Sequence, residues 1–233
     1  MIREHRFSDR EALTQALLES VVATLREDLQ QQGGASLLAS GGSTPGPLYR
    51  LLSEVELPWE QVQVALVDER WVAPDHDASN ERLLRQTLLQ NRAATANFIA
   101  MKNGSATPAD GVAACNRAYR ALQMPATVCL LGMGPDAHTA SLFPGAEGLA
   151  EAFASAGPCA AIEAQRSAVT GEYTSRMTMT PQALLQSRLL VLLITGEDKW
   201  QVYRQALEAA DPLLSPVSLF LQQAASLEVY WAP

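Results

Sequence analysis

The sequence predicts an α/β protein with a largely parallel sheet and helices on both of its faces. Two observations support this prediction. The expected strands are short, continuous apolar runs, which is typical of strands buried on both faces of a sheet. Segments with helical spacing of apolar residues separate these runs, as crossovers between parallel strands require. The chain of 233 residues has no stretch with the composition of a linker, so we expect a single domain over residues 1–233.

Strands are expected where short runs of apolar and β-branched residues occur. In chain order, the predicted strands are 35–39, 62–67, 127–131, 189–195 and 227–231. Residues 160–165 and 175–180 also read as extended segments. The longest aliphatic run, Leu189 to Ile194, has six residues and is far shorter than the roughly 20 residues that cross a bilayer.

Helices are expected where apolar residues recur at every third or fourth position. In chain order, the predicted helices are 8–32, 45–52, 79–90, 107–122, one that starts at 181, and 199–210. Ser8 is the expected N-cap of the first helix, and Gly33 is expected to follow its end. Pro108 and Pro181 stand where a first helical turn tolerates proline.

Charge and cysteine content limit the class of partner and the compartment. The chain has 17 basic and 25 acidic side chains, a net charge of −8, which argues against nucleic-acid binding. Its first residues are charged and have no apolar run of a secretory signal. Three widely spaced cysteines suit a reducing compartment and are expected to be buried. We expect a cytoplasmic protein, a monomer by default, with no membrane partner.

The turn Ser40-Gly41-Gly42-Ser43-Thr44 follows a predicted strand and precedes a helix. Glycines allow close approach of an anion, and the helix start offers free N–H groups. The turn lacks the lysine of a P-loop, so a nucleoside triphosphate is not expected. An ordinary capped turn is the alternative interpretation.

Charged residues follow other strands of the predicted sheet. Asp68-Glu69-Arg70 comes directly after an apolar run and forms either a solvated loop or a polar site wall. Lys199 follows the strand 189–195, and Arg176 lies in the extended segment 175–180. Because ligands of open α/β sheets bind at the carboxyl ends of the strands, these cations are candidates for neutralising a phosphate.

A glycine-rich segment, Gly132-Met133-Gly134, precedes Asp136 and His138. A histidine in this position can accept a proton near neutral pH, although a hydrogen-bonded capping histidine is the alternative. The spacing also fits the alanine variant of a dinucleotide fingerprint, but Pro144 ends any following helix after about two turns.

Two other site types find little support. Asp75-His76-Asp77 has metal-binding side chains but no second cluster to complete a ligand set, so a solvated loop is expected. No G-x-S-x-G motif of a serine hydrolase occurs. We therefore expect neither a metal nor another cofactor.

Five segments occur in the order seen in 6-phosphogluconolactonases, which the chain resembles from about residue 40 to 199. They are SGGSTP, DERWV followed by DASN, GMGPDAHTASLFPG, RMTMT and GEDK. The related glucosamine-6-phosphate deaminases and isomerases carry different residues after Asp68-Glu69, after Ser79 and after His138. At all three points the chain is similar to the lactonases.

The resemblance implies a Rossmann-like three-layer sandwich of the NagB/RpiA-like type. It also implies hydrolysis of 6-phospho-D-glucono-1,5-lactone to 6-phospho-D-gluconate in the oxidative pentose phosphate pathway. His138 would activate water, and Asp136 and Asp68 would orient the imidazole or sugar hydroxyls. The phosphate would rest on Gly42, Ser43, Thr44, Arg70, Arg176 and Lys199.

The chain departs from the family pattern at Ala137, where these lactonases usually have glycine. If that position needs a positive φ, alanine costs roughly 1–2 kcal/mol. Two alternatives to the lactonase stay open. One is an amino-sugar-phosphate isomerase or deaminase in which Asp68 moves a proton at carbon. The other is a sugar-phosphate sensor that binds without turnover.

Overall fold

A seven-stranded parallel sheet forms the centre of the protein in the computed structural model, which describes residues 1–233. The strand order is β1-β10-β9-β6-β2-β3-β5, and every neighbouring pair is parallel. Its strands are β1 (Ile2–Arg6), β2 (Ala35–Ala39), β3 (Val62–Leu66), β5 (Asn97–Ile99), β6 (Ala126–Leu131), β9 (Ser187–Thr195) and β10 (Leu227–Ala232). The predicted α/β class and the five predicted strands are confirmed.

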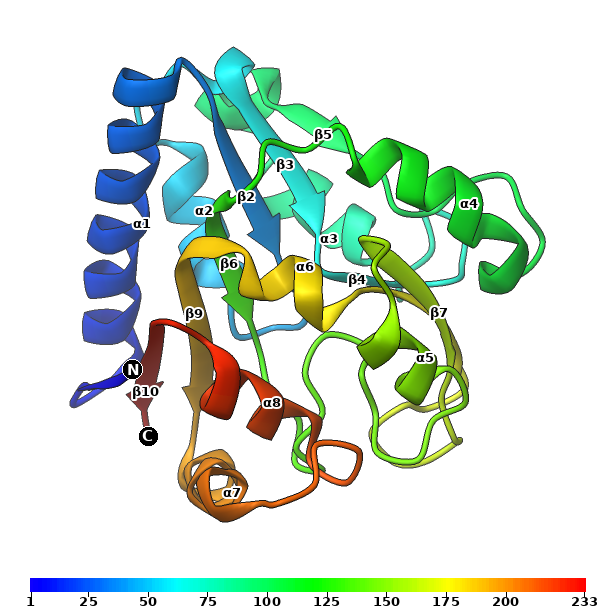
Figure 1. Ribbon diagram of the computed structural model, residues 1–233. Helices are drawn as coiled ribbons and strands as arrows, with labels where there is room; N and C mark the ends of the chain where they lie inside the picture. The colour runs from blue at the N-terminus through cyan, green and yellow to red at the C-terminus, as the bar shows by residue number, and fades with distance from the viewer.

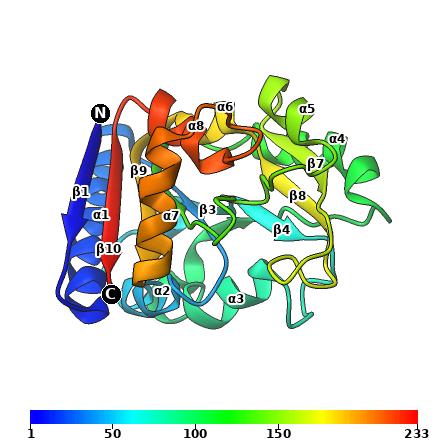
Figure 2. The ribbon, with the colours of Figure 1, turned by 90° about the horizontal axis from the view of Figure 1, so that it is seen from below.

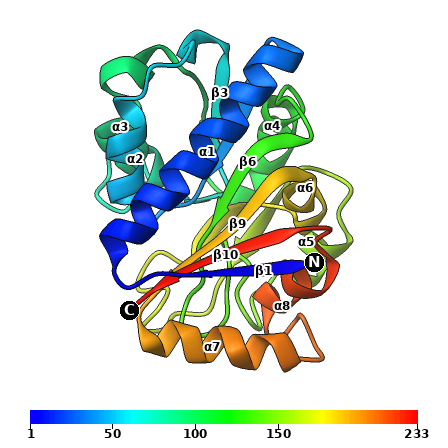
Figure 3. The ribbon, with the colours of Figure 1, turned by 90° about the vertical axis from the view of Figure 1, so that its left-hand side faces the viewer.

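Helices cover this sheet on both faces. They are α1 (Arg10–Gln32), α2 (Gly46–Ser53), α3 (Asn80–Thr87), α4 (Pro108–Tyr119), α5 (Leu149–Ala154), α6 (Pro181–Leu185), α7 (Glu197–Glu208) and α8 (Pro216–Gln223), with short 3₁₀ helices at Trp59–Gln61 and Asn91–Thr95. Figure 1 shows α1 on the left of the sheet and α6 and α8 on its right. In Figure 3, α1 crosses the strands on the side that faces the viewer.

A second, three-stranded sheet was not predicted. It has the order β4-β8-β7, with β4 (Asp68–Arg70), β7 (Cys159–Glu163) and β8 (Ser175–Met179), and both of its pairs are antiparallel. Figure 2 shows it beside the main sheet, on the side away from β1 and β10. The segment Asp68-Glu69-Arg70 is therefore a strand, and its interpretation as a solvated loop is wrong.

The burial of the central strands explains their composition. Every residue of β2 and of β6 is buried, so neither strand alternates between apolar and polar positions. One continuous apolar core includes Leu37 and Val128 of the main sheet and Ile162 and Met177 of the smaller sheet. All three cysteines are free and buried, as expected. No helix is both long enough and apolar enough to cross a membrane.

Several predicted boundaries need correction. The N-cap of α1 is Asp9 and not Ser8, because the Asp9 carboxylate accepts a hydrogen bond of 2.8 Å from the amide of Ala12. The helices predicted to reach residues 90, 122 and 210 end at Thr87, Tyr119 and Glu208. Four elements were not predicted: strands β1 and β5 and helices α5 and α8.

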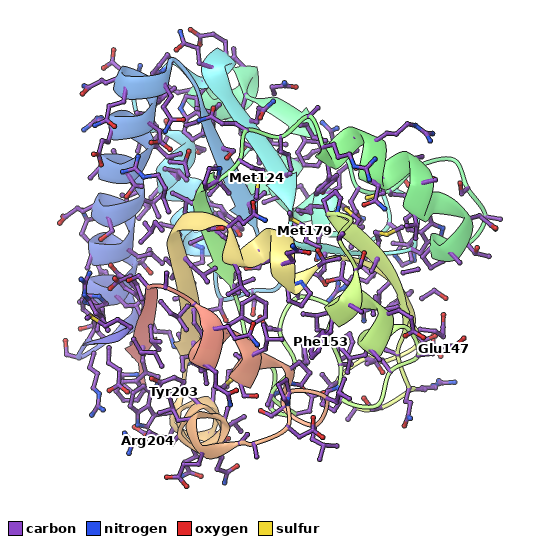
Figure 4. All side chains as sticks on the ribbon, in the orientation of Figure 1. Met124, Glu147, Phe153, Met179, Tyr203 and Arg204 are labelled. Atoms are coloured by element: carbon purple, nitrogen blue, oxygen red, sulfur yellow. The ribbon has the colours of Figure 1, made fainter.

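Polar contacts between distant segments tie two helices to strands of the sheet. Figure 4 labels Tyr203 on α7, and its hydroxyl donates to a carboxylate oxygen of Glu4 in β1 at 2.9 Å. The Asp28 carboxylate on α1 is fully buried and is hydrogen-bonded and ion-paired with Arg188 at the start of β9. These contacts fix α7 against β1 and α1 against the start of β9.

Candidate active site

A cleft of about 290 Å³ lies where β2, β6 and β9 end and where β4 and β8 meet. It brings together eight of the predicted site residues: Gly42, Ser43, Thr44, Asp68, Arg70, His138, Arg176 and Lys199. The ninth, Asp136, does not line the cleft but is hydrogen-bonded to His138. The position agrees with the rule that open α/β sheets bind ligands at the carboxyl ends of their strands.

His138 and Asp136 form a hydrogen-bonded pair in the loop after β6. The Nδ1 atom of His138 lies 2.5 Å from Oδ1 of Asp136, and the two side chains are 19% and 32% exposed. Burial opposes ionisation of Asp136, but the hydrogen bonds and charge of His138 outweigh it and lower the pKa of the carboxyl. A neutral imidazole that donates from Nδ1 carries its free lone pair on Nε2.

Gly134 leaves the space that the His138 ring occupies. A Cβ atom on Gly134 would lie 2.1 Å from both Cε1 and Nδ1 of His138, closer than any real contact. The Gly134 amide also donates to the His138 carbonyl at 3.0 Å, which closes the turn. Only glycine at position 134 is therefore compatible with this placement of the imidazole.

Ala137 adopts the left-handed conformation, with a φ of 61°. The expected free-energy cost of alanine at this position therefore applies. A hydrogen bond from another segment of the chain holds the loop in this conformation. The Ala137 carbonyl accepts a hydrogen bond of 3.0 Å from the amide of Val217 in the first turn of α8. Thr139 donates from its hydroxyl to the Gly132 carbonyl at 2.8 Å. Helix α8 therefore supports the loop of His138, a role that no sequence pattern indicated.

Arg70 and Arg176 provide two cations on the wall formed by the smaller sheet. They are register partners in the antiparallel pair of β4 and β8. Arg176 is only 3% exposed, and neither guanidinium forms a salt bridge with a carboxylate. Arg70 also has a buried Nε atom without a hydrogen-bond partner. Two adjacent cations of this kind favour an anionic ligand.

Burial lowers the pKa of Arg176 to about 10; the charge of Asp68 opposes this shift, and the charge of Arg70 adds to it. The guanidinium lies over the Phe143 ring, with its Cζ 5.4 Å from the ring centroid. The His138 ring packs on the same phenyl ring at a centroid distance of 4.3 Å. Phe143 therefore contacts both the imidazole and the cationic wall, and no role for it was predicted.

The glycine-rich turn and Lys199 also line the cleft. Gly42 has a φ of 90°, which favours glycine. Gly41 lies so close to Asn80 that a Cβ atom there would be 2.0 Å from the amide oxygen of that side chain. Lys199 lies in the first turn of α7, where burial and, secondarily, Arg10 lower its pKa. Its ammonium group has no salt bridge in the structure.

Asp68 is anchored by two polar side chains. Its Oδ2 accepts a hydrogen bond from the Ser141 hydroxyl at 2.6 Å, and its backbone carbonyl accepts one from the side-chain amide of Asn80 at 2.9 Å. The carboxylate is 7% exposed and lines the cleft. The structure thus places Asp68 at the site but shows that it also links β4, α3 and the loop after β6. Neither partner was a predicted site residue.

Glu69 is turned away from the cleft and holds the start of α3. Its carboxylate accepts hydrogen bonds from the amides of Asn80 and Glu81, each at 2.8 Å, and from the Ser79 hydroxyl at 3.0 Å. Burial raises the pKa of Glu69 despite these hydrogen bonds. The alternation of a strand explains why Glu69 faces α3 while its neighbours Asp68 and Arg70 line the cleft.

The segment Asp75-His76-Asp77 does not form a cluster with other metal-binding side chains. No group of three or more His, Cys, Asp or Glu side chains is arranged to hold a metal ion. Asp77 is instead paired with Arg82, and His76 packs edge-on against Tyr173. The segment is a loop, as predicted, and part of it is ordered by these contacts.

Comparison with known proteins agrees with this fold. The family model described as glucosamine-6-phosphate isomerases/6-phosphogluconolactonase matches residues 8–231. The 6-phosphogluconolactonase of Rhizobium meliloti (strain 1021) is 40% identical over 98% of both chains. That of Mesorhizobium japonicum is 37% identical over 97% of this chain and 94% of its own. The crystal structure of a 6-phosphogluconolactonase from Shewanella baltica OS155 has a TM-score of 0.94 at 38% identity, covering 100% of this chain and 98% of that one. The chain belongs to the glucosamine-6-phosphate isomerase/6-phosphogluconolactonase family.

Proposed function

We propose that the protein is a 6-phosphogluconolactonase, which hydrolyses 6-phospho-D-glucono-1,5-lactone to 6-phospho-D-gluconate in the oxidative pentose phosphate pathway. The relatives and the structural neighbour described above carry that name. One observation in the structure supports the same reaction most directly. A single cleft is lined by His138, which is paired with Asp136 behind it, and by three cations that have no carboxylate partner. A phosphorylated substrate that needs a general base fits this combination.

The phosphate of the substrate is assigned to the cationic part of the cleft. Arg70, Arg176 and Lys199 supply charge, and the turn at Gly42, Ser43 and Thr44 supplies hydroxyl and backbone donors. Binding of this remote group fixes the position of the lactone ring. Binding energy is thereby used to orient the reacting carbonyl toward His138.

His138 is assigned as the general base. Its Nε2 lone pair takes a proton from water as the water oxygen bonds to the lactone carbonyl carbon. The tetrahedral intermediate then collapses, the bond from this carbon to the ring oxygen breaks, and the imidazolium returns its proton to that oxygen. One water molecule is added in total, and the imidazole is regenerated. Asp136 accepts the hydrogen bond from Nδ1, which keeps the neutral imidazole in the tautomer with a free lone pair on Nε2. The same carboxylate stabilises the imidazolium.

Asp68 is assigned to the orientation of sugar hydroxyls, since its carboxylate lines the cleft but is already held by Ser141. We also propose that the enzyme is a cytoplasmic monomer that needs no cofactor and binds neither nucleic acid nor membrane. The acidic composition supports the absence of a nucleic-acid partner.

The test is hydrolysis of freshly generated 6-phosphogluconolactone, measured against its spontaneous hydrolysis. We expect clear acceleration by the wild type and a loss of about 10²–10⁴-fold in kcat for His138→Ala. Binding of 6-phosphogluconate should be retained in that variant. Acceleration that survives the substitution would remove His138 from its assigned role. Ammonia or a ketose as the product from glucosamine 6-phosphate would instead support the isomerase or deaminase.

A further inference from the structure

Two loops next to the cleft hold the guanidinium groups of the cationic wall through backbone carbonyls. The β4–α3 loop, residues 71–79, provides the Ala78 carbonyl, which accepts from Nη1 of Arg70 at 2.7 Å. The β7–β8 loop, residues 164–174, provides the Tyr173 carbonyl, which accepts from Nε of Arg176 at 2.5 Å. Thr170 in the same loop accepts from Nη2 of Arg176 at 3.3 Å. Each arginine is thus oriented by irregular backbone and not by a carboxylate.

The two loops contact each other through aromatic side chains. The rings of His76 and Tyr173 pack edge-on, with centroids 5.2 Å apart and an interplanar angle of 71°. His76 is fixed to its own loop, because its Nδ1 accepts a hydrogen bond of 3.0 Å from the amide of Ala78. This amide belongs to the residue whose carbonyl holds Arg70. Tyr173 likewise provides both the ring of the contact and the carbonyl that holds Arg176.

The β7–β8 loop also forms part of the cleft. Val169 lines the cleft although it is 37% exposed. The ion pair of Arg166 and Glu172 in this loop is exposed on both sides, at 73% and 75%, and contributes little to order. At its carboxyl end the loop is joined to the β4–α3 loop by the Trp71 amide, which donates to the Ser175 carbonyl at 2.9 Å. Further from the strands, the aromatic contact of His76 and Tyr173 also joins the two loops.

We propose that His76 and Tyr173 are positioning residues for the phosphate of the substrate. Their edge-on contact holds the β4–α3 loop against the β7–β8 loop and thereby fixes the Ala78 and Tyr173 carbonyls. Those carbonyls orient Arg70 and Arg176 toward one anion. Neither ring needs to contact substrate. The inference rests on the proposed function for the identity of the substrate, but its anion-binding part stands on the contacts alone.

The experiment is a double-mutant cycle of His76→Ala and Tyr173→Ala, read out as kcat and KM for 6-phosphogluconolactone and as the inhibition constant of inorganic phosphate. An aromatic pair of this kind predicts a rise of about two- to tenfold in KM and in the inhibition constant for each single variant. In the double variant, KM and the inhibition constant should be no more than about twofold higher than in either single variant, because the aromatic contact is lost only once. The kcat value should stay within about twofold of the wild type.

Two further variants separate positioning from general damage to the loop. Tyr173→Phe keeps the ring, and the tyrosine hydroxyl forms no hydrogen bond in the structure. This variant should therefore have the KM of the wild type, in contrast to Tyr173→Ala. Glu172→Gln removes the exposed ion pair of the same loop and should change KM by less than about twofold.

Unchanged KM in Tyr173→Ala, additive effects in the cycle, or a fall in kcat at constant KM would overturn the inference. The proposed function would fail separately, if the wild type did not accelerate lactone hydrolysis. Phosphate affinity, measured by calorimetry, would then still decide whether the aromatic contact acts on the anion site.

Discussion

Arg70 and Arg176 face each other across the antiparallel pair of β4 and β8, and neither has a carboxylate partner. Like charges directly opposite each other destabilise a strand pair. The smaller sheet therefore keeps an electrostatic repulsion that a bound phosphate would relieve. Affinity for the ligand and stability of the ligand-free protein are thus opposed at this wall.

A phosphorylated ligand should stabilise the protein against unfolding. A ligand at 100 times its Kd adds about 2.7 kcal/mol to the free energy of unfolding, which raises the Tm by about 5–11 °C in a protein of this size. We expect such a shift with 6-phosphogluconate in a thermal melt of the wild type, and a much smaller one with gluconate. Arg70→Gln should lose most of the shift at the same concentration. An equal shift with gluconate would contradict the phosphate assignment.

The Asp136–His138 pair should make stability depend on pH in the acid range. The pKa of Asp136 is lowered in the folded state, so its contribution is fully present above the unfolded value of about 3.9. The contribution is lost as the pH falls through the lower, folded pKa. In urea unfolding, the wild type should therefore be more stable than Asp136→Asn above about pH 4, and the difference should shrink below that pH. A difference that grows as the pH falls below about 4 would contradict this pairing.

Gly134→Ala should reduce activity by displacing the imidazole. The added Cβ would lie 2.1 Å from the His138 ring, so the ring must move away from its position beside Asp136. We expect kcat to fall by at least about tenfold, since a misplacement of about 1 Å can cost about 10²-fold. Gly104→Ala is the matched control, because a Cβ there meets no atom within 4 Å. A Gly134→Ala enzyme with wild-type kcat would show that the ring tolerates another position.

Ala137→Gly should stabilise the protein. Alanine in the left-handed region, at a φ of 61°, costs roughly 1–2 kcal/mol, which glycine avoids. After allowance for the greater chain entropy of glycine, we expect a gain of about 1 kcal/mol, or about 2–4 °C in Tm. Ala118→Gly within α4 provides a control of opposite sign, at about 0.5–1 kcal/mol of destabilisation. A lower Tm for Ala137→Gly would show that the strain is relieved by some other means.

Local sequence patterns were sufficient for the elements that are long or buried. The apolar runs at β2, β6 and β9 predicted buried parallel strands, and the residues that follow them predicted most of the cleft. Strand β4 was missed because three residues are too few to show a period. Its partner β8 lies more than 100 residues further along the chain, and only that pairing defines it.

Other parts of the site depend on contacts between distant segments. The amide of Val217 supports the Ala137 carbonyl, and the Ser141 hydroxyl anchors Asp68; neither contact follows from the local spacing of residues. Ser8 was predicted as the N-cap of α1, but Asp9 is an equally good N-cap residue, and the local pattern does not distinguish the two. The residue types of the site could therefore be predicted from the sequence. The contacts that support them could be found only in the three-dimensional structure.

The pairing of β1 with β10 has a consequence for synthesis on the ribosome. The side chain of Arg3 meets that of Glu228, 225 residues further along the chain, so β1 has no strand partner until β10 has been made. At about 5–20 residues per second, this delay is roughly 11–45 s. Once β9 has been made, its edge stays uncovered until β10 follows, since β10 is also its partner. The edge strand β1 is therefore translated before the other strands of the main sheet, and it is among the last to pair.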